Sequence, residues 1–188
     1  MRDIKSWSRL DNAAKIFPPT SSKRDPKVFR FACELYETVD EQVLQQALDQ
    51  TVTQFPFYKS VLKKGAFWYY FEESALHPVV AEESQDPCAA LYNADHPGLL
   101  FRVFYYRKRI NLEVFHALTD GMGAVRFLCT LVSFYLAAKH PDCPDGELQI
   151  DGYGSSQEQI RQDAFKKYYD RAEICKPGLP HQGRASPG

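Results

Sequence analysis

The stretch EVFHALTDGMGAVRFL, residues 113–128, joins two different hydrophobic patterns. As far as His116 it has the apolar character of a β-strand, and from Met122 to about Lys139 apolar residues recur at helical spacing. Strand alternation places His116 on the same face as Val114. The stretch therefore predicts a junction at which a strand ends, a histidine is presented, and a long helix begins.

The sequence on either side of this junction predicts further strands and helices. They are a strand at 27–39, an amphipathic helix at about 41–54 with Asp40 as its N-cap, a hairpin at Gly65, and an antiparallel pair of strands within 99–118. The helix that begins at Met122 is apolar nearly all round, which predicts that it is covered on most sides. The run FWYYF, residues 67–71, predicts strand core rather than a binding platform.

Composition indicates a globular protein and excludes several function classes. The 188 residues are 44% hydrophobic and carry a net charge of −1, so no basic excess is present to bind nucleic acid. No apolar stretch has the length of a secretory signal or a membrane span, and we therefore expect a cytoplasmic protein. The five cysteines are scattered without metal-ligand spacing, so no metal site is expected.

We expect three parts along the chain. Residues 1–152 are predicted to form the main domain, 153–175 a surface or bridging helix, and 176–188 a polar tail rich in proline and glycine.

Two interpretations of His116 are open at this level. One is a packed core histidine that hydrogen-bonds to the backbone. The other is a reacting group, because Asp120 stands at a helix start, where a carboxylate is favoured, and Gly121 and Gly123 leave space on either side of Met122 for a ligand to approach backbone amides. A histidine titrates near neutrality and suits proton removal from a hydroxyl or thiol, while such amides can stabilise an oxyanion.

The residues from His116 to Gly121, HALTDG, match the pattern HxxxDG. In this the sequence resembles the chloramphenicol acetyltransferase-like superfamily, which includes alcohol O-acetyltransferases, BAHD plant acyltransferases and peptide-synthetase condensation domains. The stretch 39–62 looks like the superfamily's early helix and the strand after it. The resemblance covers about residues 10–140 and looks closest to bacterial alcohol acetyltransferase-like proteins. It implies an α/β (α+β sandwich) fold, with a mixed, largely antiparallel sheet packed against helices.

The resemblance also implies roles for single residues. His116 would be the general base that deprotonates the acceptor, Asp120 would pair with a basic side chain, and Gly121 would keep the donor's path open. An acyl-CoA would be the co-substrate, with no cofactor held permanently, and an alcohol or amine would be the acceptor. Three basic residues are open as the partner of Asp120: Lys59, Arg102 and Arg126.

Two features of the superfamily are missing from this sequence. Phe115 stands where many members have a second histidine, and no DFGWG motif occurs. Because 67 residues follow Gly121, the motif's position fits the N-terminal half of a two-domain enzyme. We therefore expect a half that is completed by a C-terminal half, a second chain or self-association. The alternative function is a non-catalytic half-domain that serves as an interaction or scaffold module.

Overall fold

The structure is a computed structural model that describes residues 7–10, 14–22 and 24–141. All of these residues belong to the first of the chain's two units, Met1–Gly154. The helix predicted at 153–175 and the tail predicted at 176–188 lie outside the described residues.

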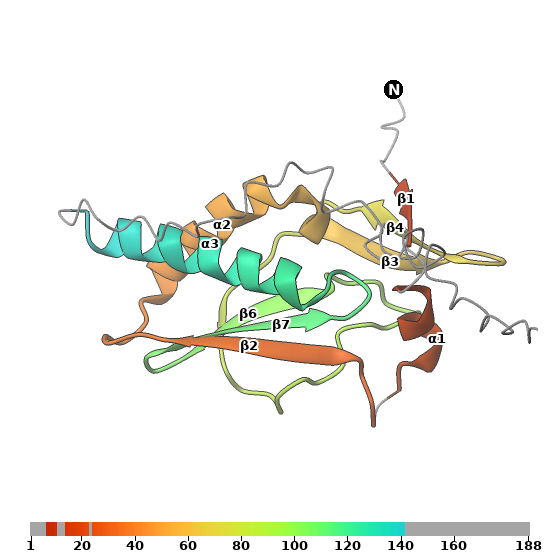
Figure 1. The fold of residues 1–188 in the computed structure, drawn as a ribbon, viewed down its shortest axis with the longest axis horizontal. Helices are drawn as coiled ribbons and strands as arrows, with labels where there is room; N and C mark the ends of the chain where they lie inside the picture. Colours follow the sequence, from red (N-terminus) through yellow and green to blue (C-terminus); the bar gives the residue numbers. More distant parts are fainter. Residues whose placement is uncertain (1–6, 11–13, 23, 142–188) are drawn as a thin grey trace, which may run out of the picture. The chain divides into compact units, whose positions relative to one another are not determined.

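The larger sheet has four strands in the order β2-β7-β6-β5. Figure 1 shows β2, β7 and β6 side by side. Strand β7 is antiparallel to both β2 and β6, and the short β5 is parallel to β6. The mixed, largely antiparallel sheet predicted from the sequence is confirmed. The strand bounds are β2 Val28–Glu34, β5 Ala81–Glu82, β6 Phe101–Tyr106 and β7 Arg109–Phe115.

A smaller antiparallel sheet has the strand order β1-β4-β3. Its strands are β1 Trp7–Arg9, β3 Ser60–Lys64 and β4 Tyr69–Glu73. The predicted hairpin at Gly65 is confirmed, because β3 and β4 pair on either side of it and the Gly65 N–H donates to the Trp68 carbonyl at 2.8 Å. A single bridge between Val61 and Leu99 joins β3 to the residues just before β6.

Two long helices, α2 (Glu41–Gln54) and α3 (Gly121–Lys139), pack against each other, and α3 also packs on β2 and β7. Asp40 caps α2 as predicted, since its carboxylate accepts from the N–H groups of Gln42 and Val43. The far end of α3 is tied to the same cap, because the backbone N–H of Asp40 donates to the Tyr135 hydroxyl at 2.9 Å. Three short helical turns complete the described chain: η1 Ala14–Ile16, α1 Phe17–Thr20 and η2 Pro56–Lys59.

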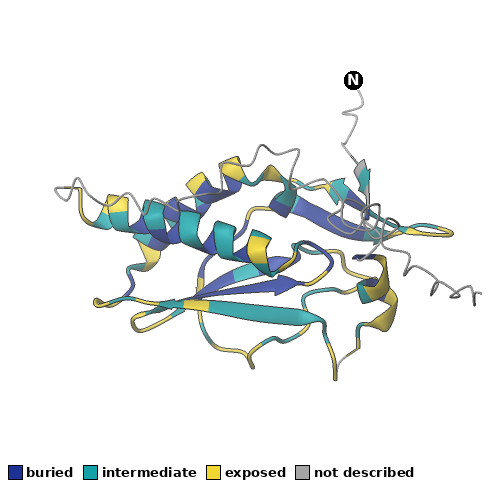
Figure 2. Ribbon diagram, in the orientation of Figure 1, coloured by how far each residue is buried: buried dark blue, intermediate teal, exposed yellow. Residues whose placement is uncertain are grey.

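Helix α3 is less covered than its composition predicts. Val125 and Cys129 of α3 are half-buried, and Met122 is 47% exposed. Figure 2 shows intermediate and exposed residues along α3 beside its buried ones. The prediction of a helix covered on most sides is therefore wrong: its fully buried residues form one face, Ala124, Phe127, Leu128, Leu131, Val132 and Tyr135. Among the described residues α3 alone is long and apolar enough to cross a membrane, a test that the core helix of a soluble protein also passes.

Two strand predictions also need correction. Strand β2 ends at Glu34 instead of residue 39, because Glu34 pairs with Arg109, the first residue of β7. Beyond it, two backbone hydrogen bonds to the β6–β7 turn, from Leu35 to Lys108 and from Val39 to Arg107, replace the regular ladder. The FWYYF run is buried only at Phe71. Phe67 is 89% exposed and Trp68 56% exposed, since both lie in the turn of the β3–β4 hairpin.

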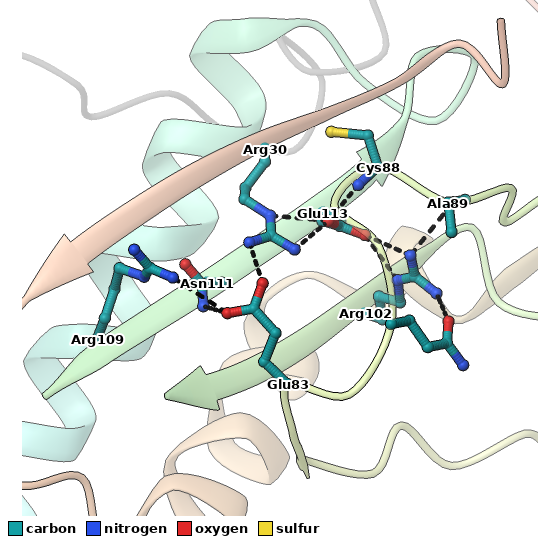
Figure 3. Close-up of polar contacts among 9 residues, drawn as sticks. Arg30, Glu83, Cys88, Ala89, Arg102, Arg109, Asn111 and Glu113 are labelled. Carbon is teal, nitrogen blue, oxygen red and sulfur yellow. Dashed lines mark hydrogen bonds and ion pairs between the residues drawn. The ribbon is translucent and has the colours of Figure 1, made fainter. Parts of the chain in front are cut away.

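A cluster of buried ion pairs lies on one face of the larger sheet (Figure 3). Glu113 of β7 has no exposure to solvent and stands in register between Arg30 of β2 and Arg102 of β6. Its carboxylate is 2.6 Å from a terminal nitrogen of each guanidinium group. The Cys88 N–H donates to the same carboxylate at 2.6 Å.

The cluster fastens the segment before β6 to the sheet. Glu83 pairs with Arg30 and, at 3.1 Å, with Arg109, and hydrogen bonding by the Arg30 guanidinium lowers the pKa of the Glu83 carboxyl. Arg102 donates to the Ala89 carbonyl at 3.2 Å. Three strands and the segment around 83–89 are therefore held at one point.

Replacing Glu113 by glutamine should destabilise the protein strongly. The change keeps the shape of the side chain but removes the carboxylate that pairs with Arg102 and one of the two carboxylates that pair with Arg30, which keeps Glu83. Breaking a buried ion pair costs about 3–5 kcal/mol. The free energy of unfolding in urea measures the effect. The matched control is Lys63→Gln, which breaks the more exposed pair with Glu72 and should cost below about 1 kcal/mol. Equal losses in the two variants would contradict a central role for the cluster.

Candidate active site

His116 lies just beyond the last residue of β7, where the strand turns toward α3. Its backbone N–H donates to the Lys27 carbonyl at 2.8 Å, which continues the pairing of β7 with β2 by one residue. Lys27 has a φ of 56°, in the left-handed region that non-glycine residues rarely adopt. The position of the histidine's backbone is thus set by the strand pairing.

The imidazole of His116 is exposed and contacts two phenyl rings. Phe17 of α1 stacks on it, with ring centroids 4.5 Å apart and planes 10° apart. Phe29 of β2 lies at 4.8 Å with a tilt of 57°. Phe29 is paired with Val114 and so lies on the same face of the sheet as Val114. Because His116 contacts Phe29, it lies on that face too, as predicted, and α3 packs on the same strands. The interpretation as a buried core histidine does not hold.

Asp120 is the N-cap of α3, as predicted. Its carboxylate accepts from the Gly123 N–H at 2.8 Å. Among the described residues, the amides of Gly121 and Met122 in the same helix turn have no hydrogen-bond acceptor. Within the described part of the chain, the start of α3 therefore presents two N–H groups without an acceptor beside an acidic cap, close to the histidine in sequence.

Tyr58, which the sequence did not single out, holds the loop at the start of α3 through a contact with Gly123. It is buried, its ring stacks on Phe127 at 4.2 Å, and its hydroxyl donates to the Gly123 carbonyl at 3.2 Å. Burial raises the pKa of the Tyr58 phenol well above its usual value, so the hydroxyl stays protonated as a donor. A tyrosine directly after a predicted helix carries no local signal for such a contact.

Gly121 and Gly123 differ in the space that surrounds them. A Cβ on Gly121 would lie 3.8 Å from the Phe31 ring, an ordinary contact, so this position remains compatible with the predicted donor path. A Cβ on Gly123 would lie 2.0 Å from the Thr119 hydroxyl oxygen. Glycine is thus required here by the loop's own Thr119, and the role of Gly123 in substrate binding stays a prediction.

The basic partner predicted for Asp120 is not found among the described residues. Arg102 is excluded, because its guanidinium is occupied by Glu113 on the sheet. No ion pair joins Asp120 to Lys59, which is half-buried at the end of η2, or to Arg126 on α3. In the described part of the chain, capping of α3 and the Tyr58 contact hold the loop in place of an ion pair.

The described residues contain no group of three or more side chains able to hold a metal ion. Cys129 on α3 is half-buried, and burial raises the pKa of its thiol, which disfavours the reactive thiolate.

Comparisons with known proteins were informative only at the level of structure. No protein-family model and no curated protein matches the sequence. A mutant of the starter condensation domain of the rhizomide synthetase RzmA, in complex with C8-CoA, matches with a TM-score of 0.63 and 15% identity, over 89% of this chain and 43% of that one. The chain has a condensation-domain-like fold.

Other solved structures agree with this condensation-like fold. The first condensation domain of the calcium-dependent antibiotic synthetase, in complex with a substrate analogue, matches with a TM-score of 0.58 and 19% identity, over 88% of this chain and 46% of that one. Polyketide synthase associated protein 5 from Mycobacterium tuberculosis matches with a TM-score of 0.52 and 16% identity, over 73% and 34%. At these identities the likeness shows the fold alone. The chain spans less than half the length of each of these proteins.

The two glycines provide a matched pair of variants. Gly121→Ala should change the free energy of unfolding by no more than about 0.5 kcal/mol, because the added methyl group meets only ordinary contacts. Gly123→Ala should destabilise by roughly 1–3 kcal/mol, because the methyl group overlaps Thr119. Adding Thr119→Ala to Gly123→Ala should recover part of that loss. Denaturant titrations measure all three variants, and equal effects of the two glycine changes would contradict this account of the loop.

Proposed function

We propose that the chain is the N-terminal half of an acyltransferase that uses His116 as general base. The acceptor's hydroxyl or amine loses its proton to the imidazole while its oxygen or nitrogen attacks the acyl carbonyl. The donor is a thioester, and its carbon–sulfur bond then breaks, so that the thiolate leaves and takes up a proton. The observation that carries the proposal is an exposed imidazole held at the strand-to-helix junction of a condensation-like fold.

The start of α3 supports this chemistry electrostatically. The free amides of Gly121 and Met122 lie at the positive end of the helix dipole, where negative charge is stabilised. Such amides suit the oxyanion that develops on the acyl carbonyl during attack. In this proposal Asp120 shapes the helix start and does not exchange protons.

The proposed donor is an acyl-CoA. One of the matching condensation domains has C8-CoA bound, and the chain shares its fold over 89% of its own length. The proposed acceptor is an alcohol, with an amine as the other possibility, because either gives up its proton to a histidine during attack on a thioester.

We propose that the reaction channel needs a second wall. The chain covers 43% and 46% of two matching condensation domains, and Met122 at the start of α3 is 47% exposed. A C-terminal half, a second chain or a second copy of this chain would supply the missing wall.

The test is acyl transfer by the 188-residue chain, alone and together with the half, chain or copy that completes it, with product esters detected by mass spectrometry after incubation with acyl-CoAs and alcohols. His116→Ala should lower kcat by about 10²–10⁴-fold, the usual contribution of a positioned general base. His140→Gln, at the far end of α3, is the matched control and should leave kcat unchanged. Unchanged turnover in His116→Ala would refute the role of the base.

The alternative function, a non-catalytic interaction module, is favoured by one observation: Met122 of α3 is exposed and Val125 is only half-buried, although both are apolar. A module of this kind would cover these residues with a second copy of the chain. Sedimentation velocity over a hundredfold range of concentration should then show dimers, and Val125→Asp should abolish them while Lys108→Asp, in the β6–β7 turn, should not. Acyl transfer that depends on His116 would argue against this alternative as the whole function.

A further inference from the structure

The His116 imidazole is oriented by ring contacts rather than by hydrogen bonds. Among the described residues neither ring nitrogen has a hydrogen-bond partner, although histidines that act as bases are usually oriented through their second nitrogen. Its contacts are the phenyl rings of Phe17 and Phe29. Of these, the Phe17 ring alone is stacked, with planes 10° apart.

Phe17 is itself held firmly. It is half-buried and packs against the hydrophobic core, and it begins α1, whose next residue, Pro18, is buried. Pro18 and Pro19 restrict the backbone on its C-terminal side. The ring is thus anchored on one side by the core and presents a face to the imidazole on the other.

We propose that Phe17 is a positioning residue for the proposed reaction: its stacked ring holds the His116 imidazole in the plane in which one ring nitrogen, at the exposed edge, faces the acceptor. This proposal rests on the assignment of His116 as the base. Stacking covers one face of the imidazole, and the lone pair of an unprotonated ring nitrogen lies in the ring plane, which stacking does not cover.

The expected size of the effect follows from the number of orientations. Without the stacked ring, the imidazole can populate three staggered χ1 wells and a broad, roughly two-fold χ2. The fraction of molecules with the imidazole in its productive orientation then falls by between about twofold and sixfold. Loss of Phe17 should lower kcat by that factor and leave the KM for the acyl donor unchanged, since Phe17 orients the base and does not bind the donor.

The first measurement is the NMR spectrum of the 188-residue chain labelled with ring-¹³C histidine, in which the His116 signal is identified by its loss in His116→Gln. A stacked phenyl ring shifts the imidazole protons upfield. Phe17→Leu should return them toward the positions of an exposed histidine, and Phe17→Tyr should retain the shift. Phe57→Leu, which removes a half-buried ring that contacts Phe71 instead, is the matched control and should leave the His116 signal unchanged.

The second measurement is the kinetic comparison of the same variants. Phe17→Leu should lower kcat by between about twofold and sixfold, with normal activity in Phe17→Tyr and Phe57→Leu. Equal kcat in Phe17→Leu and the wild type, equal losses in Phe17→Leu and Phe17→Tyr, or a wild-type His116 signal without an upfield shift would each overturn the proposal.

The two proposals fail in distinguishable ways. Full turnover in His116→Ala refutes the base and with it the catalytic part of this inference, whereas the NMR comparison still decides whether Phe17 orients the ring. A shift that is lost in Phe17→Leu without any change in kcat refutes the positioning role and leaves the base assignment intact.

Discussion

A single carboxylate without solvent exposure, that of Glu113, fixes how the larger sheet is assembled. It accepts hydrogen bonds from Arg30 on one neighbouring strand and from Arg102 on the other. A slip of one residue in either pairing would turn a charged side chain into the apolar face that packs on α3, at a cost of several kcal/mol. Because His116 follows Glu113 by three residues, the register that satisfies the carboxylate also determines where the imidazole is presented.

The parts of the fold with local chemical signals could be predicted from the sequence. Asp40 and Asp120 cap helices because each is extended directly before the helix and its short carboxylate reaches the first N–H groups, and Gly65 lies in a hairpin turn. The end of β2 could not be predicted, because β7 stops it and β7 lies far away in sequence. Likewise, the apolar composition of α3 gives no information on how many neighbours are available to cover it.

In the candidate site, too, the parts with local signals could be predicted and the contacts between distant segments could not. The motif located His116 and the cap, but the contacts that hold them come from Phe17 and Tyr58, which lie on separate segments. The space beside Gly123 is filled by Thr119, which only the three-dimensional path of the loop reveals. One signal was available: Arg30, Arg102 and Glu113 are charged residues inside mostly apolar strands, and charges in buried strands require partners.

The pairing of β2 with β7 has a consequence for the way the protein reaches its native state. Arg30 and Glu113 are 83 positions apart, so forming this pair closes a long loop before any contact compensates for the lost chain entropy. Strand β7 is central in the order β2-β7-β6-β5, and its hairpin with β6 is local and can form early, whereas β2 must be added from a distance. The environment of His116, which takes its backbone acceptor and both phenyl rings from residues before position 30, is thus a late product of folding. An intermediate that holds only the local hairpins would carry the motif without its environment.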